Sequence, residues 1–278
     1  MLAIGMEYKT IAGIKLPAIG IGTWGMGKAK VGERPESSND EGCIAAIREA
    51  IKLGMWHIDT AEMYSSGHAE QIVAKAIKGI PREQVFITTK VMPSNLTREY
   101  LLAAARSSLQ RLQISYADLY LIHWVKSTGQ IQEAMEAMDE LVESGKVKNI
   151  GVSNFSTAQL KLAQSHTDNK IITNQVEYSL LDRSCEKELL PYCQENDIIL
   201  TAYSPLDQGK LLKNKTLATI AAKHNKTVAQ VALNWLVSHE NVITIPKAAT
   251  LEHVRENAGA VGWKLDKEDM ELLNLNFL

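Results

Sequence analysis

The chain has few of the features that mark disulfide-rich, metal-binding or membrane-spanning proteins. Its three cysteines, Cys43, Cys185 and Cys193, form no CxxC pair. An odd number of cysteines without that spacing argues against a disulfide framework and against a zinc site. No stretch approaches the roughly 18 apolar residues of a membrane span, and the first residues show no basic start followed by an apolar run. We therefore expect a cytoplasmic protein with reduced thiols and no bound metal.

An excess of charge of one sign is missing as well. The 30 Lys and Arg residues nearly balance the 32 Asp and Glu residues, and no segment concentrates the basic ones. Proteins that bind nucleic acid usually carry a basic patch or stripe. We therefore expect a small-molecule partner rather than nucleic acid or a membrane, and a monomer as the default assembly. What the chain does have is 45% apolar residues, enough over 278 positions to bury a large core.

Short apolar runs alternate with longer amphipathic stretches, after an opening hairpin of residues 8–11 and 14–16 around Gly13. Between the runs, apolar residues recur at helical spacing, as in 43–51 and 101–112. The stretch 225–240 predicts an additional helix before the last run. The runs that we interpret as strands are residues 18–22, 56–59, 85–89, 118–123, 147–152, 173–176, 198–202 and 242–245.

Repeated strand–helix units favour parallel strands, because each helix carries the chain back to the start of the next strand. Eight such units in about 250 residues are typical of a closed barrel rather than an open sheet. No linker or compositional break divides the sequence. The prediction is an α/β fold in which a single (β/α)8 TIM-barrel domain spans residues 1–278 and carries an N-terminal β-hairpin.

Two phosphate-binding motifs near the start are misleading. Gly20, Gly22 and Gly25 spell GxGxxG, and residues 22–28 spell GxxxxGK. The first motif needs a helix that opens at its third glycine, but the chain continues glycine-rich and charged with no apolar period. The second needs a Ser or Thr after its lysine, where this chain has Ala29. We interpret these glycines as part of a loop at the barrel mouth.

Ionisable side chains end three consecutive predicted strands. Asp59 ends the second, Lys90 follows the third and His123 ends the fourth, while Tyr64 lies five residues beyond Asp59. Catalytic groups of a (β/α)8 barrel come from the carboxyl ends of different strands. We therefore expect Asp59, Tyr64, Lys90 and His123 to converge at the barrel mouth as a catalytic group.

These residue types have a combined chemical logic. Tyrosine titrates near 10 and donates a proton sluggishly at neutral pH unless a cation such as Lys90 lowers its pKa. Asp59 would keep the Lys90 ammonium charged despite burial, and His123 could donate a hydrogen bond to a carbonyl oxygen that develops negative charge. Each residue alone also has an ordinary explanation: a solvated lysine, a helix-capping aspartate or a core histidine. Their joint placement favours catalysis.

The sequence resembles the aldo-keto reductase family. Residues 57–64, HIDTAEMY, are similar to the family signature GxxxxDxAxxY, with Gly54, Asp59, Ala61 and Tyr64 in place. The resemblance continues through ITTK at 87–90, DLYLIHW at 118–124, GVSNF at 151–155, NQVEYS at 174–179, AYSPL at 202–206 and IPK at 245–247. It implies an NAD(P)H-dependent oxidoreductase that reduces aldehydes and ketones to alcohols, with Tyr64 as proton donor.

The resemblance also implies a nicotinamide cofactor. Ser153, Asn154 and Gln175 would bind its carboxamide, and Tyr203 would stack on the nicotinamide ring. Lys247 follows the last strand, where it could pair with the 2′-phosphate of NADPH, although a solvated surface lysine is the ordinary explanation. The residues expected to bind the cofactor are Gly22, Thr23, Asp59, Ser153, Asn154, Gln175, Tyr203, Ser204, Pro205, Leu206, Lys247, His253 and Asn257.

The chain departs from the family pattern near the 2′-phosphate. Relatives have KS followed by an arginine, whereas this chain has Lys247–Ala248 and carries His253 where the arginine is expected. Histidine is mostly neutral at pH 7 and lacks the fork of arginine. Arg255 lies two residues further along, and on a helix its side chain would point away from the face that carries His253. We predict a modest preference for NADPH, with NADH as a second cofactor.

For the substrate, the resemblance places Trp24, His123 and Trp124 around the pocket, with Met26 and Met63 as neighbours. Packing in the core is the ordinary explanation for such aromatic residues. The chain ends at Leu278, shortly after the last predicted helix, so the long C-terminal loop of many relatives is not expected. An open pocket for small or varied carbonyl compounds follows.

Two other functions fit the same fold. In the first, the barrel is catalytically silent and acts as a binding or regulatory subunit. In the second, it is a glycosidase that uses two carboxylates, which needs a second acid near Asp59; Glu62 and Glu177 are the candidates. The presence of all four predicted catalytic residues argues against a purely structural role.

Overall fold

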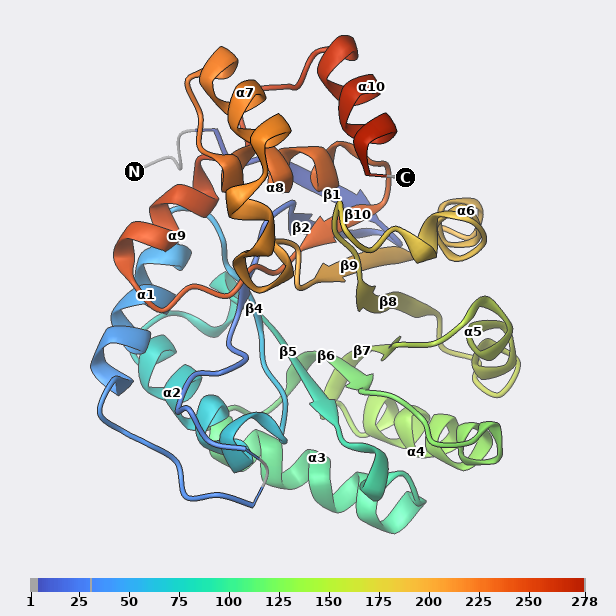
Figure 1. The fold of residues 1–278 in the computed structure, drawn as a ribbon. Helices are drawn as coiled ribbons and strands as arrows, with labels where there is room; N and C mark the ends of the chain where they lie inside the picture. The colour runs from blue at the N-terminus through green and yellow to red at the C-terminus, as the bar shows by residue number, and fades with distance from the viewer. Residues whose placement is uncertain (1–4, 31, 278) are drawn as a thin grey trace.

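Eight parallel strands form the centre of the molecule, with helices around them (Figure 1). The structure is a computed structural model that describes residues 5–30 and 32–277. Isolated parallel bridges from Ile19 to Thr244 and from Gly22 to Lys247 join the first strand of the sheet to the last. The sheet is therefore a closed (β/α)8 barrel, as the sequence predicted.

The barrel strands follow chain order around the sheet. All eight predicted runs are found. The first strand is shorter than the predicted 18–22, because before Ile21 the chain makes only an isolated bridge, from Ile19 to Thr244 of the last strand. The strands are β3 (Ile21–Gly22), β4 (His57–Asp59), β5 (Phe86–Val91), β6 (Ala117–Ile122), β7 (Val147–Ser153), β8 (Ile171–Glu177), β9 (Ile199–Tyr203) and β10 (Val242–Thr244).

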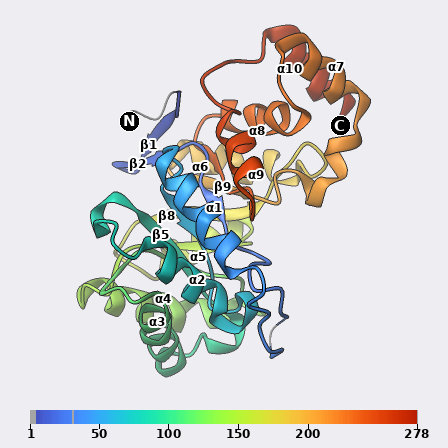
Figure 2. The same ribbon diagram turned by 90° about the vertical axis from the view of Figure 1, so that its left-hand side faces the viewer.

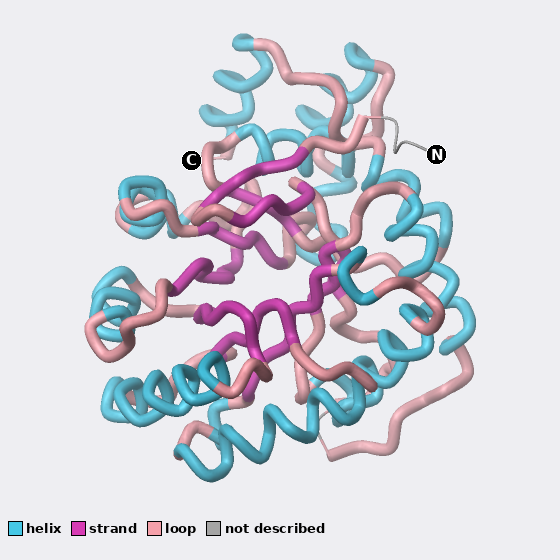
Figure 3. The backbone as a smooth tube through the Cα atoms, turned by 180° about the vertical axis from the view of Figure 1, so that it is seen from behind, coloured by secondary structure: helices cyan, strands magenta, loops and turns pink. Residues whose placement is uncertain are grey.

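Helices surround the barrel, as the view from behind shows (Figure 3). In α1, Cys43, Ala46, Ile47 and Ala50 are buried, which is the amphipathic pattern of a helix packed on a sheet. The predicted additional helix before the last strand is α8. The helices are α1 (Asp40–Lys52), α2 (His68–Ile77), α3 (Arg98–Leu112), α4 (Ile131–Glu143), α5 (Thr157–Gln164), α6 (Leu189–Glu195), α7 (Lys215–His224), α8 (Val228–Ser238), α9 (Leu251–Ala258) and α10 (Lys267–Asn276).

The predicted hairpin consists of β1 (Tyr8–Ile11) and β2 (Ile14–Pro17), which pair in antiparallel fashion. It lies beside the barrel strands near the N-terminus (Figure 2). Its Ile11 and Leu16 are buried in one cluster with Phe86 and Ile199, residues from the amino-terminal halves of β5 and β9. The hairpin therefore covers the amino-terminal end of the barrel, which leaves the carboxyl end for a binding site.

The glycine-rich segment after β3 forms turns. Gly25 and Gly27 have positive φ, and in the described part of residues 23–39, from which residue 31 is excluded, no helix begins. The first helix starts at Asp40, far from the third glycine of the GxGxxG pattern. The pattern therefore lacks the helix that would bind pyrophosphate. Within the described residues, no helix is both long and apolar enough to cross a membrane.

Candidate active site

A cleft of about 1030 Å³ opens among the carboxyl ends of the barrel strands. It contains side chains from most of the strand ends and from α9. Its wall consists of Gly22, Trp24, Asp59, Met63, Tyr64, His123, Trp124, Val125, Asn154, Gln175, Glu177, Tyr203, Ser204, Pro205, Leu206, Gln208, Gly209, Leu212, Ala229, Ile245, Pro246, Lys247, His253, Glu256 and Asn257.

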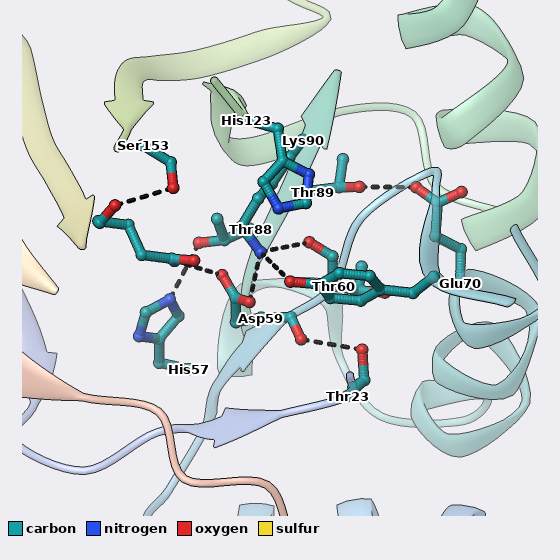
Figure 4. A network of polar contacts seen from close by, with 12 residues as sticks. Thr23, His57, Asp59, Thr60, Glu70, Thr88, Thr89, Lys90, His123 and Ser153 are labelled. Atoms are coloured by element: carbon teal, nitrogen blue, oxygen red, sulfur yellow. Dashed lines mark hydrogen bonds and ion pairs between the residues drawn. The ribbon is translucent and has the colours of Figure 1, made fainter. Parts of the chain in front are cut away.

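Lys90 lies fully buried beneath this cleft, and its ammonium joins the predicted residues. Its Nζ donates hydrogen bonds to Asp59 Oδ1 at 2.5 Å, to the Thr60 carbonyl at 3.0 Å and to the Tyr64 hydroxyl at 3.1 Å. Figure 4 shows Lys90, Asp59 and Thr60 meeting at one point. The ammonium thus has three oxygen partners, which is what a buried cation requires.

The charge balance differs in one respect from the sequence argument. Burial lowers the pKa of Lys90, but Asp59 and Tyr64 outweigh it, so that the Lys90 pKa is raised and the ammonium stays charged. Burial raises the pKa of Tyr64, and nearby Lys90 opposes that rise without reversing it. The expectation of a lowered tyrosine pKa is therefore wrong for the protein itself, because the cost of burying a phenolate exceeds the effect of the cation.

Asp59 has both carboxylate oxygens occupied. Lys90 holds Oδ1, and the Gln175 side-chain amide donates to Oδ2 at 2.7 Å. The glycosidase reading needs a free acid here. Of its other candidates, Glu62 is buried and accepts from the Met92 N–H at 2.6 Å outside the cleft wall, while Glu177 lines the cleft. Because both of its oxygens are engaged, Asp59 is better suited to hold Lys90 in place than to act as a nucleophile.

His123 is buried beside Tyr64 and Trp124. Its ring meets theirs edge to face, with centroids 5.7 and 4.7 Å apart. Burial, assisted by Lys90, lowers the pKa of His123 to about 2, so the imidazole is neutral. Its Nδ1 is buried without a hydrogen-bond partner among the described residues, which leaves Nε2 to meet a ligand in the cleft. A neutral ring with its proton on Nε2 can donate one hydrogen bond there.

Asn154 links two other site residues. Its backbone is left-handed, with φ at 60°, and its Oδ1 accepts from the Tyr203 hydroxyl at 2.8 Å. Its Nδ2 donates to the His123 carbonyl at 3.1 Å. Asn154 therefore joins the aromatic wall at Tyr203 to His123, the residue that follows β6.

The other end of the cleft is more exposed. Lys247, next to the end of β10, and His253, in α9, are both exposed, and Asn257 is buried one helical turn beyond His253. Thr250 caps α9 by accepting from the His253 N–H at 3.3 Å. Arg255 points elsewhere, as expected, because its Nε pairs with Glu49 at 2.8 Å. Two basic side chains therefore face this end.

Most of the predicted binding residues line the cleft, but Thr23, Ser153 and Met26 do not. Thr23 is buried, and its Oγ1 donates to the Asp59 carbonyl at 3.0 Å. Ser153 is buried, and its Oγ donates to the Gln175 carbonyl at 2.8 Å. Met26 is packed in the core. The family resemblance placed Ser153 at the cofactor and Met26 near the substrate, but in the structure these three side chains bond to the backbone or pack in the core instead of lining the cleft.

Sequence reasoning missed several wall residues. Glu256 could have been found, because it lies one turn beyond His253 on the same face of α9. Gln208, Gly209 and Leu212 come from an irregular turn of residues 207–213 with no recognisable motif. No local signal marks that turn as part of the cleft.

Comparisons with known proteins agree with this architecture. A family model described as the Aldo/keto reductase family matches residues 18–274. Methylglyoxal reductase YeaE of Escherichia coli (strain K12) is 42% identical over 267 residues, which cover 94% of this chain and 91% of that protein. Glyoxal reductase of Bacillus subtilis (strain 168) is 39% identical over 264 residues, 94% of this chain and 89% of that protein.

A solved structure is similar over the whole fold. The crystal structure of an aldo/keto reductase from Klebsiella pneumoniae in complex with NADP and acetate matches with a TM-score of 0.91 and 36% identity. The match covers 99% of this chain and 96% of that one.

Proposed function

This chain belongs to the aldo/keto reductase family, and we propose that it acts as one domain that reduces small aldehydes and ketones to alcohols with NADPH. The observation that carries the proposal is the buried contact of Lys90 with both Asp59 and Tyr64 at the floor of the cleft. The reductase names of the relatives and the NADP in the Klebsiella structure support the reaction class and the cofactor.

The cleft fits a nicotinamide dinucleotide. Its volume is about 1030 Å³, and its wall includes both Tyr64 and Lys247. A Cβ at Gly22 would lie 2.6 Å from the Ile245 carbonyl, so only glycine fits at this point of the wall. When bound, NADPH supplies the hydride that reduces the carbonyl carbon. The residues that would hold it are Gly22, Asp59, Asn154, Gln175, Tyr203, Ser204, Pro205, Leu206, Lys247, His253 and Asn257.

Tyr64 is the proton donor in this proposal. Its hydroxyl lies 3.1 Å from the Lys90 ammonium, which stabilises the phenolate left behind after the proton moves to the carbonyl oxygen. Neutral His123 donates a hydrogen bond from Nε2 to the same oxygen and thereby orients the carbonyl. The raised pKa of Tyr64 keeps the hydroxyl protonated until a substrate is present.

The aromatic wall favours small uncharged substrates. Trp24, Met63 and Trp124 line the cleft around Tyr64 and His123, and Trp24 is 60% exposed. Such a wall offers apolar contacts to a small molecule and supplies no charged partner for a carboxylate or phosphate group. Methylglyoxal and glyoxal, the compounds named for the two relatives, are suitable first substrates.

The substitution Tyr64→Phe tests this proposal. We expect methylglyoxal reduction to fall by at least about a thousandfold, while the Kd for NADPH changes less than about twofold, because only the phenolic proton is lost. Tyr100→Phe, at an exposed position of α3, is the matched control and should behave as wild type. Retention of more than about a tenth of wild-type turnover by Tyr64→Phe would exclude Tyr64 as the acid.

A further inference from the structure

Two serines with unusual backbone geometry directly follow Tyr64. Ser65 has φ 48° and ψ 43°, and Ser66 has φ 54° and ψ 38°, both in the left-handed region that glycine adopts most easily. Ser65 is buried, with 3% of its surface exposed, whereas Ser66 is exposed. Strained residues that persist next to an active site are held there by their surroundings.

The Ser65 hydroxyl contacts the loop that follows β3. Its Oγ donates to the Met26 carbonyl at 2.6 Å and accepts from the Ala29 N–H at 3.2 Å. Between these points, a Cβ added to Gly27 would lie 3.0 Å from the Ser65 Cβ and 2.8 Å from His68 Cδ2. The loop backbone therefore rests directly on Ser65.

The same loop is also fixed on the other side of Tyr64. Thr23 donates to the Asp59 carbonyl from its N–H and from its Oγ1, each at 3.0 Å. Residues 23–29 are thus bonded to the chain both before Tyr64, at Asp59, and immediately after it, at Ser65. Trp24, which lines the cleft, lies within this doubly fixed segment.

We propose that Ser65 is a positioning residue that holds the Trp24 loop and Tyr64 in one fixed relation. The aromatic wall that contacts the substrate and the hydroxyl that protonates it then keep a constant separation. The inference rests on the proposed role of Tyr64 as acid. It explains why a buried serine is kept in a left-handed conformation: its hydroxyl makes two loop contacts that glycine cannot make.

The first test compares Ser65→Ala with Ser66→Ala. Ser66 shares the left-handed backbone, but its Oγ accepts from the exposed Gly32 N–H at 3.0 Å. We expect Ser65→Ala to lower kcat for methylglyoxal about tenfold, because Tyr64 loses its fixed distance to the substrate. The Kd for NADPH should change less than about twofold, and Ser66→Ala should match wild type. An unchanged kcat in Ser65→Ala, or an equal loss in Ser66→Ala, would overturn the proposal.

A second readout needs no cofactor. Lys28 lies between the two loop residues that Ser65 contacts, so trypsin should cut after Lys28 faster in Ser65→Ala than in wild type or Ser66→Ala. Equal cleavage rates in the three proteins would show that the hydroxyl does not hold the loop.

Ser65→Gly keeps the proposal testable if the alanine variant folds poorly. Glycine adopts the left-handed backbone without strain but lacks the hydroxyl. We expect the same loss of kcat even though glycine removes the backbone strain at position 65. Wild-type turnover in Ser65→Gly would overturn the proposal. If Tyr64→Phe is inactive while both Ser65 variants are fully active, only the positioning role fails. If Tyr64→Phe is active, the proposed function itself fails.

Discussion

The charged side chains at the two parts of the cleft differ in their burial. At the Tyr64 end, Lys90 and Asp59 have side chains that are 0% and 2% exposed and are paired inside the protein. At the Lys247 end, the two basic side chains that face the cleft are exposed to water. A buried pair that loses one partner leaves an uncompensated charge, whereas an exposed side chain can change with little effect on stability. In the proposed function, the catalytic residues are therefore also part of the buried core, whereas the residues proposed to set the cofactor preference are exposed and can change without loss of stability.

The largest effect should come from breaking the buried pair. Lys90→Met should abolish turnover over the whole accessible pH range and lower the free energy of unfolding by about 3–5 kcal/mol, because the Asp59 carboxylate loses its cation. Both quantities can be measured, by steady-state kinetics and by urea unfolding. Lys210→Met, which removes a lysine paired with Asp207 at an exposed position, is the control and should change neither strongly. Full turnover of Lys90→Met at low pH would contradict the role of the cation.

A smaller effect concerns acid stability at the same end. His57 lies fully buried below Asp59, with Nε2 2.9 Å from the Thr88 hydroxyl, and burial lowers its pKa to about 4. The pKa of histidine in an unfolded chain is about 6.5. Between pH 6.5 and pH 4, His57 is therefore protonated in the unfolded chain but stays neutral in the folded protein. The stability contributed by neutral His57 is therefore present above pH 6.5 and is lost as the solution is acidified.

Urea unfolding at pH 7 and pH 5 measures this loss. His57 should account for about 2 kcal/mol of the decrease in unfolding free energy between the two values. The variant His57→Gln should show a correspondingly weaker pH dependence, whatever its stability at pH 7. Equal pH dependence of wild type and variant would mean that His57 titrates alike in both states.

The smallest effect is expected at the exposed end. His253→Arg should raise the ratio of kcat/KM for NADPH over NADH, and Lys247→Met should lower it, each about tenfold, the strength of one charge-assisted hydrogen bond. Arg255→Ala is the matched control, because its guanidinium pairs with Glu49 away from the cleft. The ratio is measured with one aldehyde at constant ionic strength. If all variants give the wild-type ratio, neither Lys247 nor His253 contacts the 2′-phosphate.

Several features of the site were predictable because they are local. Asp59, Lys90 and His123 each come at the end of an apolar run, and in a parallel barrel all such ends face one side. The structure brings these residues and Tyr64 together at one cleft, as expected. The departure at His253 was likewise visible in the sequence, and the structure places this side chain in the cleft wall.

Other features depend on partners far away in the chain. The position of Ser153 in a GVSNF motif does not say that its hydroxyl bonds back to the Gln175 carbonyl. Thr23 follows a cleft glycine but turns toward Asp59, a partner 36 residues away. The contact between Ser65 and the Met26 loop spans 39 residues and has no sequence signature. Such contacts are set by the pairing of neighbouring strands, which brings their end loops together.

The sequence by itself determined the barrel, its hairpin and the residues at the strand ends, because apolar periodicity and chain order are local and repeat eight times. Only the tertiary structure decided the ionisation of those residues. The pKa of Tyr64 is raised rather than lowered because burial, which depends on every surrounding element, outweighs the one cation that the sequence could identify. It also decided which polar side chains reach the cleft, because that depends on which way each strand end turns.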